Sequence, residues 1–267
     1  MMIEKQIIGA VFFDYDGTLT DGAAGILETT PATRRAVAKL RDNGYLAVLD
    51  TGRAMCYANR SGVDFDGMIT SNGAHAMVRG ETVLDSPIGD EALARLMARL
   101  NGMGIYYGID NPEKCYAQDM DAPDFTRWIT TFGISREVFR PIRPGEKPVG
   151  YKLSVLYHTM EEVERLRAEF GDLFSFDCHR GYPCVDVTAR SANKGVGVRA
   201  VLRRFGLTRE RAFAFGDGAN DLDMLAAVGH PIAMGRHAAE LDDVCEYVTR
   251  SVAQEGIEYG LRHYGLI

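Results

Sequence analysis

The chain has 267 residues, of which 46% are hydrophobic and 25% are charged, so it can bury an ample core and is long enough for two domains. Its net charge of −7 argues against general binding to nucleic acids or membranes. The five cysteines include no C-x-x-C pair and are expected to be reduced thiols of a cytoplasmic protein. The first apolar run is too short for a signal peptide or a transmembrane helix.

The first predicted strand, residues 7–13, ends on two carboxylates in the segment Asp14-Tyr15-Asp16-Gly17-Thr18. An unbroken apolar run is typical of a parallel strand covered on both faces, and ligands bind beyond the carboxyl ends of such strands. A carboxylate there can act as a nucleophile, and a second one nearby can act as general acid and base. The alternative interpretation is a turn rich in Asp and Gly.

A second apolar strand is predicted over residues 45–50 and runs into Thr51-Gly52-Arg53. This segment supplies a hydroxyl, a glycine that lets the backbone approach a ligand, and a cation. Asp50 precedes it, and the sequence leaves three interpretations open: Asp50 lies on the other face of the strand, pairs with Arg53, or alters the site.

About 140 residues separate Arg53 from Lys194, far more than a connection within one α/β unit needs. We therefore expect an inserted domain over residues 83–186, with the core formed by residues 1–82 and 187–267. Ser71-Asn72-Gly73-Ala74 is expected to close a core strand, and residues 77–83 to form a hairpin at the junction. Within the insert, helices are predicted from an Asp90 N-cap to Asn101-Gly102, over residues 125–131, and from Thr159, which forms a capping box with Glu162. Strands are predicted over residues 105–109, 115–118, 152–157, 174–178 and 184–187, and the segment 140–148 is predicted to be a loop.

The loop His179-Arg180-Gly181-Tyr182-Pro183 joins two predicted strands of the insert and carries two donors and a ring. Loops on a rigid scaffold often determine specificity, so His179 and Arg180 are candidate substrate contacts. The alternative is a solvated hairpin turn.

Lys194 opens a predicted helix, where its charge works against the helix dipole. This placement suggests an anionic partner, although an exposed lysine at a frayed helix end is the simpler alternative. A further strand over residues 212–215 ends in Gly216-Asp217-Gly218-Ala219-Asn220-Asp221, followed by another predicted helix.

The acids at these strand ends would repel one another in one crevice unless a divalent cation joined them. The four acids are Asp14, Asp16, Asp217 and Asp221. Oxygen ligands of this kind favour Mg²⁺, which binds a few carboxylates together with substrate phosphate. Thr51 and Lys194 would then supply a donor and a positive charge to the phosphate.

In order and spacing, the four segments resemble motifs I to IV of the haloacid dehalogenase superfamily of phosphotransferases. The resemblance implies an α/β fold, with a Rossmann-like parallel sheet core, helices on both faces and an inserted α/β cap domain. It implies Asp14 as nucleophile and magnesium ligand, and Asp16 as general acid and base and as a ligand through its backbone carbonyl. It further implies that Thr51, Gly52 and Lys194 hold the phosphoryl group. Asp217 would bind the metal directly, Asp221 would act behind it or through water, and Asn220 would orient phosphate or a metal-bound water.

The insert resembles the large α/β cap of the Cof-type branch, whose members act mostly on sugar phosphates and similar small phosphomonoesters. Asp16 also distinguishes branches, because ion-pumping ATPases carry threonine there and dehalogenases lack the acid. The expected protein is a magnesium-dependent phosphomonoester hydrolase with an aspartyl-phosphate intermediate and a small phosphorylated metabolite as its partner. A phosphomutase is the alternative enzyme. A phosphate-binding protein without catalysis is the other alternative, and the intact pair of Asp14 and Asp16 opposes it.

Overall fold

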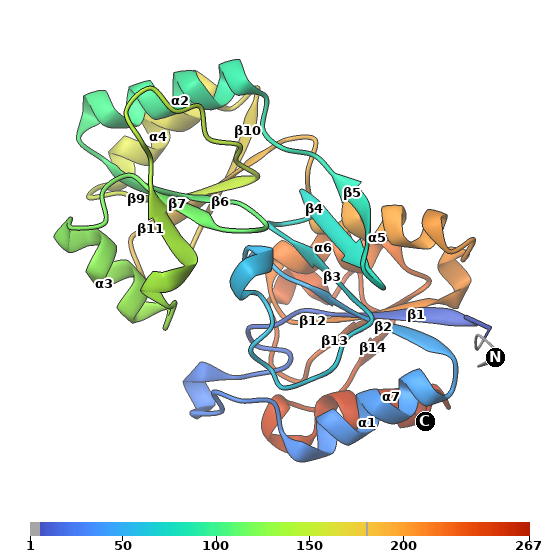
Figure 1. The fold of residues 1–267 in the computed structure, drawn as a ribbon. Coiled ribbons are helices and arrows are strands. Elements are labelled where there is room, and N and C mark those ends of the chain that lie inside the picture. Colours follow the sequence, from blue (N-terminus) through green and yellow to red (C-terminus); the bar gives the residue numbers. More distant parts are fainter. Residues whose placement is uncertain (1–5, 180) are drawn as a thin grey trace.

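The computed structural model describes residues 6–179 and 181–267. They form two β-sheets, each covered by its own helices (Figure 1). One sheet has eight strands in the order β14-β13-β12-β1-β2-β3-β4-β5, and the other has six in the order β10-β11-β9-β6-β7-β8. The six-stranded sheet is contributed entirely by the segment between β5 and the helix that begins at Lys194. The first sheet is called the core sheet and the second the cap sheet below.

The core sheet is parallel from β14 through β3 and ends in an antiparallel hairpin of β4 and β5. Its strands are β1 (Gly9–Phe13), β2 (Tyr45–Asp50), β3 (Gly67–Thr70), β4 (His75–Val78), β5 (Glu81–Asp85), β12 (Ala212–Gly216), β13 (His230–Ala233) and β14 (Tyr247–Val248). The apolar run predicted to be a strand covered on both faces is β1, all of whose residues are buried. Side chains alternate across it, so Ala10 and Phe12 join one core cluster and Val11 and Phe13 the other.

Helices cover both faces of the core sheet, as the α/β fold class requires. α1 (Pro31–Asp42) and α7 (Gly256–His263) pack on one face, while α5 (Lys194–Arg204) and α6 (Leu222–Ala227) pack on the other (Figure 1). The predicted α/β fold class is confirmed. No helix in the described part of the chain is long and apolar enough to cross a membrane.

The cap sheet is mixed and carries helices on both of its faces. Its strands are β6 (Tyr106–Asp110), β7 (Cys115–Ala117), β8 (Phe139–Pro141), β9 (Lys152–Leu156), β10 (Phe174–Cys178) and β11 (Cys184–Ala189). α2 (Asp90–Met103) and α4 (Met160–Phe170) pack on the outer face (Figure 1). α3 (Pro123–Thr131) packs on the inner face, in a cluster that also contains Ala54 and Tyr57 of the core. The inner face of the cap sheet is therefore the face in contact with the core.

Two expected elements differ in detail. Asp90 is the first residue of α2 and Gly89 its N-cap, and the helix continues past Asn101-Gly102 to Met103. It ends there because Gly104 adopts a left-handed conformation, φ 67°, in which its N–H bonds to the carbonyls of Asn101 and Leu100. The loop predicted over residues 140–148 begins with β8, a three-residue strand too short to show a pattern.

Other predicted features are present. The capping box of Thr159 and Glu162 opens α4, and the hairpin of β4 and β5 turns at Arg79-Gly80. The division into residues 1–82, 83–186 and 187–267 stays a prediction. Its boundaries fall inside β5 and β11, which extend to Asp85 and Ala189.

Candidate active site

Asp14 lies directly beyond β1, the central strand of the core sheet. Its backbone N–H donates to the carbonyl of Phe215 on the adjacent strand β12, 3.0 Å away, which fixes the chain at this edge. The residue is 6% exposed. Burial and the nearby Asp221 raise the pKa of Asp14 well above its ordinary value, with Lys194 opposing the shift.

Lys194 is the first residue of α5, held there by its N-cap Asn193, whose side chain accepts from the N–H of Val196. Its Nζ lies 2.5 Å from Oδ1 of Asp14 and 2.6 Å from Oδ1 of Asp221. Burial alone would lower the pKa of Lys194, but these carboxylates outweigh it and raise the pKa. The anionic partners expected for this lysine are therefore carboxylates, and the alternative of an exposed lysine at a frayed end is wrong.

Three carboxylates meet at the ends of β1 and β12. Oxygens of Asp14, Asp217 and Asp221 lie within 4.8 Å of one another. Asp221 is oriented by two backbone donors, because its Oδ2 accepts from the N–H of Asp217 at 3.0 Å and from that of Gly218 at 2.9 Å. Burial, and then Asp221, raises the pKa of Asp217 to about 7. Closely spaced carboxylates that repel one another are a donor set that fits Mg²⁺.

Gly17 lets the segment after Asp14 pass this cluster. Its φ is 100°, and a Cβ built there would lie 2.1 Å from a carboxylate oxygen of Asp217. Both the conformation and the contact require glycine. Thr18 follows and donates its hydroxyl to Asp217, 3.2 Å away.

Asp16 does not join the three carboxylates. Its side chain is 67% exposed and is held by Arg53, whose Nη2 lies 2.7 Å from Oδ1 and 3.0 Å from Oδ2. The Arg53 guanidinium in turn lies 3.9 Å from the centre of the Tyr15 ring. The Asp16 carboxylate is thus accessible and held by Arg53, two residues along the chain from Asp14.

Thr51 and Gly52 lie at the end of β2, the strand that pairs with β1. Thr51 is buried, and its hydroxyl accepts from the N–H of Arg53 at 3.2 Å. A Cβ added to Gly52 would lie 2.7 Å from Oδ1 of Asn72. Asn220 is exposed on the short 3-10 turn Ala219–Asp221. These residues are near the expected phosphate position by strand order, and their roles stay predictions.

Asp50 does not pair with Arg53. It is completely buried, and within the described residues neither carboxylate oxygen has a hydrogen-bond partner. Burial raises its pKa well above the ordinary value, and the charge of Lys194 only partly opposes this. Arg53 instead pairs with Asp16.

A second charged cluster faces the core from the inner face of the cap sheet. Lys152 lies 2.9 Å from Asp186 and 3.5 Å from Asp110, and all three side chains are at least nine-tenths buried. Nε2 of His179, one of the predicted substrate contacts, lies 3.2 Å from Asp186. Arg180, the other, lies outside the described residues.

The sequence analysis missed Arg53 as the partner of Asp16, and it missed the cap cluster. Arg53 had a signal, since it directly follows Thr51-Gly52. The cap cluster had a weaker signal: its members Lys152, Ser154 and Asp186 are polar positions that alternate with apolar ones in two predicted strands. Alternation shows that they share a face, but not which element covers that face.

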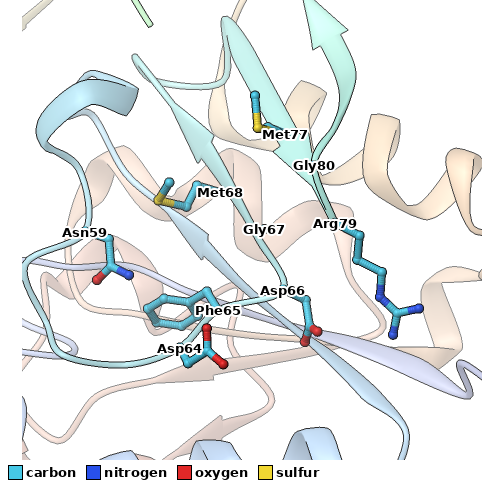
Figure 2. Close-up of a pocket in the computed structure, with 9 residues that line it drawn as sticks. All are labelled: Asn59, Asp64, Phe65, Asp66, Gly67, Met68, Met77, Arg79 and Gly80. Atoms are coloured by element: carbon cyan, nitrogen blue, oxygen red, sulfur yellow. The ribbon is translucent and has the colours of Figure 1, made fainter. Parts of the chain in front are cut away.

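A separate hollow lies on the core beside β3 and β4 (Figure 2). Its acids are already paired, because Arg41 lies 2.5 Å from Asp64 and 3.1 Å from Asp66. It is lined by Asn59, Asp64, Phe65, Asp66, Gly67, Met68, Met77, Arg79 and Gly80. No residue of the site described above contributes to it.

Comparison with known proteins agrees with this geometry. The family model of haloacid dehalogenase-like hydrolases matches residues 11–261, so the chain belongs to that family. A provisionally named phosphatase of Bacillus subtilis, YkrA, is 25% identical over 96% of this chain and 98% of its own length. A phosphoglycolate phosphatase of Methanothermobacter thermautotrophicus is 26% identical, with coverage of 96% and 98%.

Solved structures extend the comparison. A protein of Geobacillus kaustophilus has a TM-score of 0.85 at 28% identity, covering 97% of this chain and 99% of that one. The subclass IIB sugar phosphatase BT4131 has a TM-score of 0.82 at 25% identity, covering 97% and 100%. The expected membership of the haloacid dehalogenase superfamily is confirmed, and the family and its named relatives support a phosphatase.

Proposed function

We propose that the protein is a magnesium-dependent phosphomonoester hydrolase that works through an aspartyl phosphate on Asp14. Its substrates would be small phosphorylated metabolites, sugar phosphates among them, in the cytoplasm. The observation that carries this proposal is the arrangement around Asp14: a buried carboxylate on Lys194, beside two further acids, with the accessible carboxylate of Asp16 two residues away.

The mechanism needs two displacements at phosphorus. Asp14 attacks, a bond forms between its oxygen and phosphorus, and the ester bond breaks while Asp16 gives a proton to the departing oxygen. Water then attacks the aspartyl phosphate, Asp16 takes its proton, and release of phosphate restores Asp14. Lys194, with donors at Thr51 and Gly52, would hold the phosphoryl oxygens in place.

Asp14 and Asp217, with the backbone carbonyl of Asp16, are the residues that would hold Mg²⁺ directly. Asp221, whose oxygens accept from Lys194 and two backbone N–H groups, would act behind them or through water. When bound, the ion would offset the charge of phosphate and carboxylates. Arg53 has a positioning part in this scheme, because it keeps the Asp16 carboxylate from turning away into solvent.

Substitution of the nucleophile tests the proposal. Asp14→Asn removes the attacking oxyanion at constant volume, so kcat with p-nitrophenyl phosphate and Mg²⁺ should fall by about 10³-fold or more. Acid quenching of the wild type during turnover of a ³²P-labelled substrate should trap label on the protein, and Asp14→Asn should trap none. A variant that keeps more than about a hundredth of the wild-type rate would remove Asp14 from this role.

A phosphomutase remains the alternative enzyme, and the same labelled substrate separates the two. A hydrolase releases inorganic phosphate in proportion to substrate consumed, whereas a mutase returns the label to an isomer of the substrate. A protein that only binds phosphate esters would do neither.

A further inference from the structure

The inner face of the cap sheet carries a polar cluster in β9 and β11, although the outer face of these two strands is apolar. In β9 and β11, Leu153, Val155, Val185 and Val187 pack under α2 and α4 on the outer face. Lys152, Ser154 and Asp186 alternate with them and so point inward. Strand register sets them side by side, because Asp186 is opposite Ser154 and Lys152 is opposite Asp110.

Asp186 is the member of this cluster that faces the motif at the end of β2. Its Oδ2 lies 3.6 Å from a Cβ built on Gly52, which directly follows Thr51 at the end of β2. Asp110 is turned elsewhere, since its carboxylate accepts from Ser71 of the core at 3.3 Å and lies beside Lys152. The two acids share a lysine but face different parts of the core.

The two oxygens of Asp186 have different surroundings. Oδ1 receives Lys152 at 2.9 Å and Ser154 at 3.2 Å, and it faces His179 at 3.2 Å. Oδ2 faces Gly52 of the core. A side chain this buried, held in place through one oxygen, presents the other as a fixed acceptor toward the phosphate site.

In-line displacement by Asp14 sends the leaving group away from the core sheet and toward the cap. We propose that Asp186 selects the leaving group. Its Oδ2 accepts a hydrogen bond from a hydroxyl or amine near the phosphate and repels a carboxylate or second phosphate at the same place. The substrates that fit are phosphate monoesters of neutral, hydroxylated alcohols. This inference rests on the proposed function and adds to it the chemistry of the alcohol.

The surroundings of Asp186 support this selection. Its Oδ1 contacts Lys152 and His179, which holds the carboxylate in place while Oδ2 faces Gly52. Lys152 and His179 outweigh the burial of Asp186 and lower its pKa, which keeps it ionised and restricts it to accepting hydrogen bonds.

A matched pair of substrates tests the inference in the wild-type protein. Glycerol 1-phosphate and 3-phosphoglycerate share one skeleton and differ only in a terminal hydroxymethyl group or carboxylate. With Mg²⁺ present, kcat/KM should be higher for glycerol 1-phosphate. A wild-type preference for 3-phosphoglycerate would overturn the inference.

Asp186→Asn should reduce that preference about tenfold to a hundredfold, because it removes a charge-assisted hydrogen bond and a repulsion together. Asp110→Asn is the matched control, since it takes an acid from the same lysine without changing the group that faces Gly52; its preference should stay near that of the wild type. An unchanged preference in Asp186→Asn, or an equal change in Asp110→Asn, would show that Asp186 only supports the cap.

Two further measurements keep the test decisive. If Asp186→Asn is too unstable to assay, Asp186→Ser also removes the charge and leaves Lys152 paired with Asp110, and it should show the same loss of preference. Rates with p-nitrophenyl phosphate distinguish a failure of the proposed function from a failure of the inference about Asp186. If the wild type hydrolyses neither this ester nor the pair, the proposed function itself fails and the inference with it; if it hydrolyses the aryl ester but its preference does not depend on Asp186, the inference alone fails.

Discussion

Lys194→Met should destabilise the metal-free protein, by an amount that depends on pH. The ammonium of Lys194 is fully buried and contacts the carboxylates of Asp14 and Asp221, which are 8% and 0% exposed as side chains. The methionine keeps most of the volume and the helix propensity of lysine but removes the charge. Both carboxylates would then be buried without their cation.

The size of the effect follows from the two ways in which the carboxylates can respond. A carboxylate that stays ionised without its partner costs about 3–5 kcal/mol. Protonating one instead, against an unfolded-state pKa of about 3.9, costs about 5 kcal/mol at pH 7.5 and about 2 kcal/mol at pH 5.5. The raised pKa of the variant's carboxyl group favours the fold at low pH, and this contribution is lost as pH rises. We therefore expect a loss of about 3–5 kcal/mol at pH 7.5 that shrinks to about 2 kcal/mol at pH 5.5.

Urea unfolding in the presence of a chelator, followed by circular dichroism at both pH values, measures this difference. Lys39→Met on the exposed face of α1 is the control for the substitution itself and should change stability by no more than about 0.5 kcal/mol. If Lys194→Met is as stable as the wild type at pH 7.5, or if its deficit does not shrink on acidification, Lys194 is not the counterion of these acids.

Three further outcomes test other parts of the site. Asp16→Asn should lower kcat at least about tenfold more for an alkyl phosphate than for an aryl phosphate, because only the alkoxide leaving group needs a proton. Equal losses of kcat would contradict the role of Asp16 as an acid. The pKa of Asp217 is raised to about 7, so its contribution to the metal-free fold is present at low pH and lost as pH rises through 7. Mg²⁺ should therefore raise Tm more at pH 8 than at pH 6, and equal shifts would argue against Asp217 as a ligand. Diamide, which accepts two protons and two electrons from two thiols, should join Cys56 of the core to Cys115 of the cap, whose sulfurs lie 3.6 Å apart. Activity should fall with the change in non-reducing mobility and return with dithiothreitol, and Cys56→Ser should prevent both changes.

The sequence predicted the core well because its signals are local. An apolar run that ends on polar residues identifies a buried parallel strand and its carboxyl end, and parallel strands place those ends along one edge. Asp14, Thr51 and Asp217 follow β1, β2 and β12, which are neighbours in the sheet. Lys194 was predicted to have an anionic partner from helix electrostatics alone, and its contacts with Asp14 and Asp221 agree with that.

The contacts between cap and core could not be predicted in the same way. Cys56 and Cys115 are separated by 59 residues, and Gly52 and Asp186 by more than twice that. Such contacts depend on how two sheets meet, which no local pattern states. Asp50 shows a different limit: its place in a buried strand was visible, but no local pattern indicates that its carboxylate has no hydrogen-bond partner among the described residues, while Arg53 pairs with Asp16.

On both the core side and the cap side of the site, the acids outnumber the buried ammonium groups. On the core side Lys194 is the buried ammonium among Asp14, Asp50, Asp217 and Asp221, and on the cap side Lys152 is shared by Asp110 and Asp186. Burial and mutual repulsion raise the pKa values of Asp14, Asp50 and Asp217. A phosphate dianion entering between these groups would add to the repulsion, and deprotonating Asp14 for attack would add more. A divalent cation on the three clustered carboxylates would remove both obstacles at once, so charge balance predicts that the proposed metal and phosphate sites depend on each other.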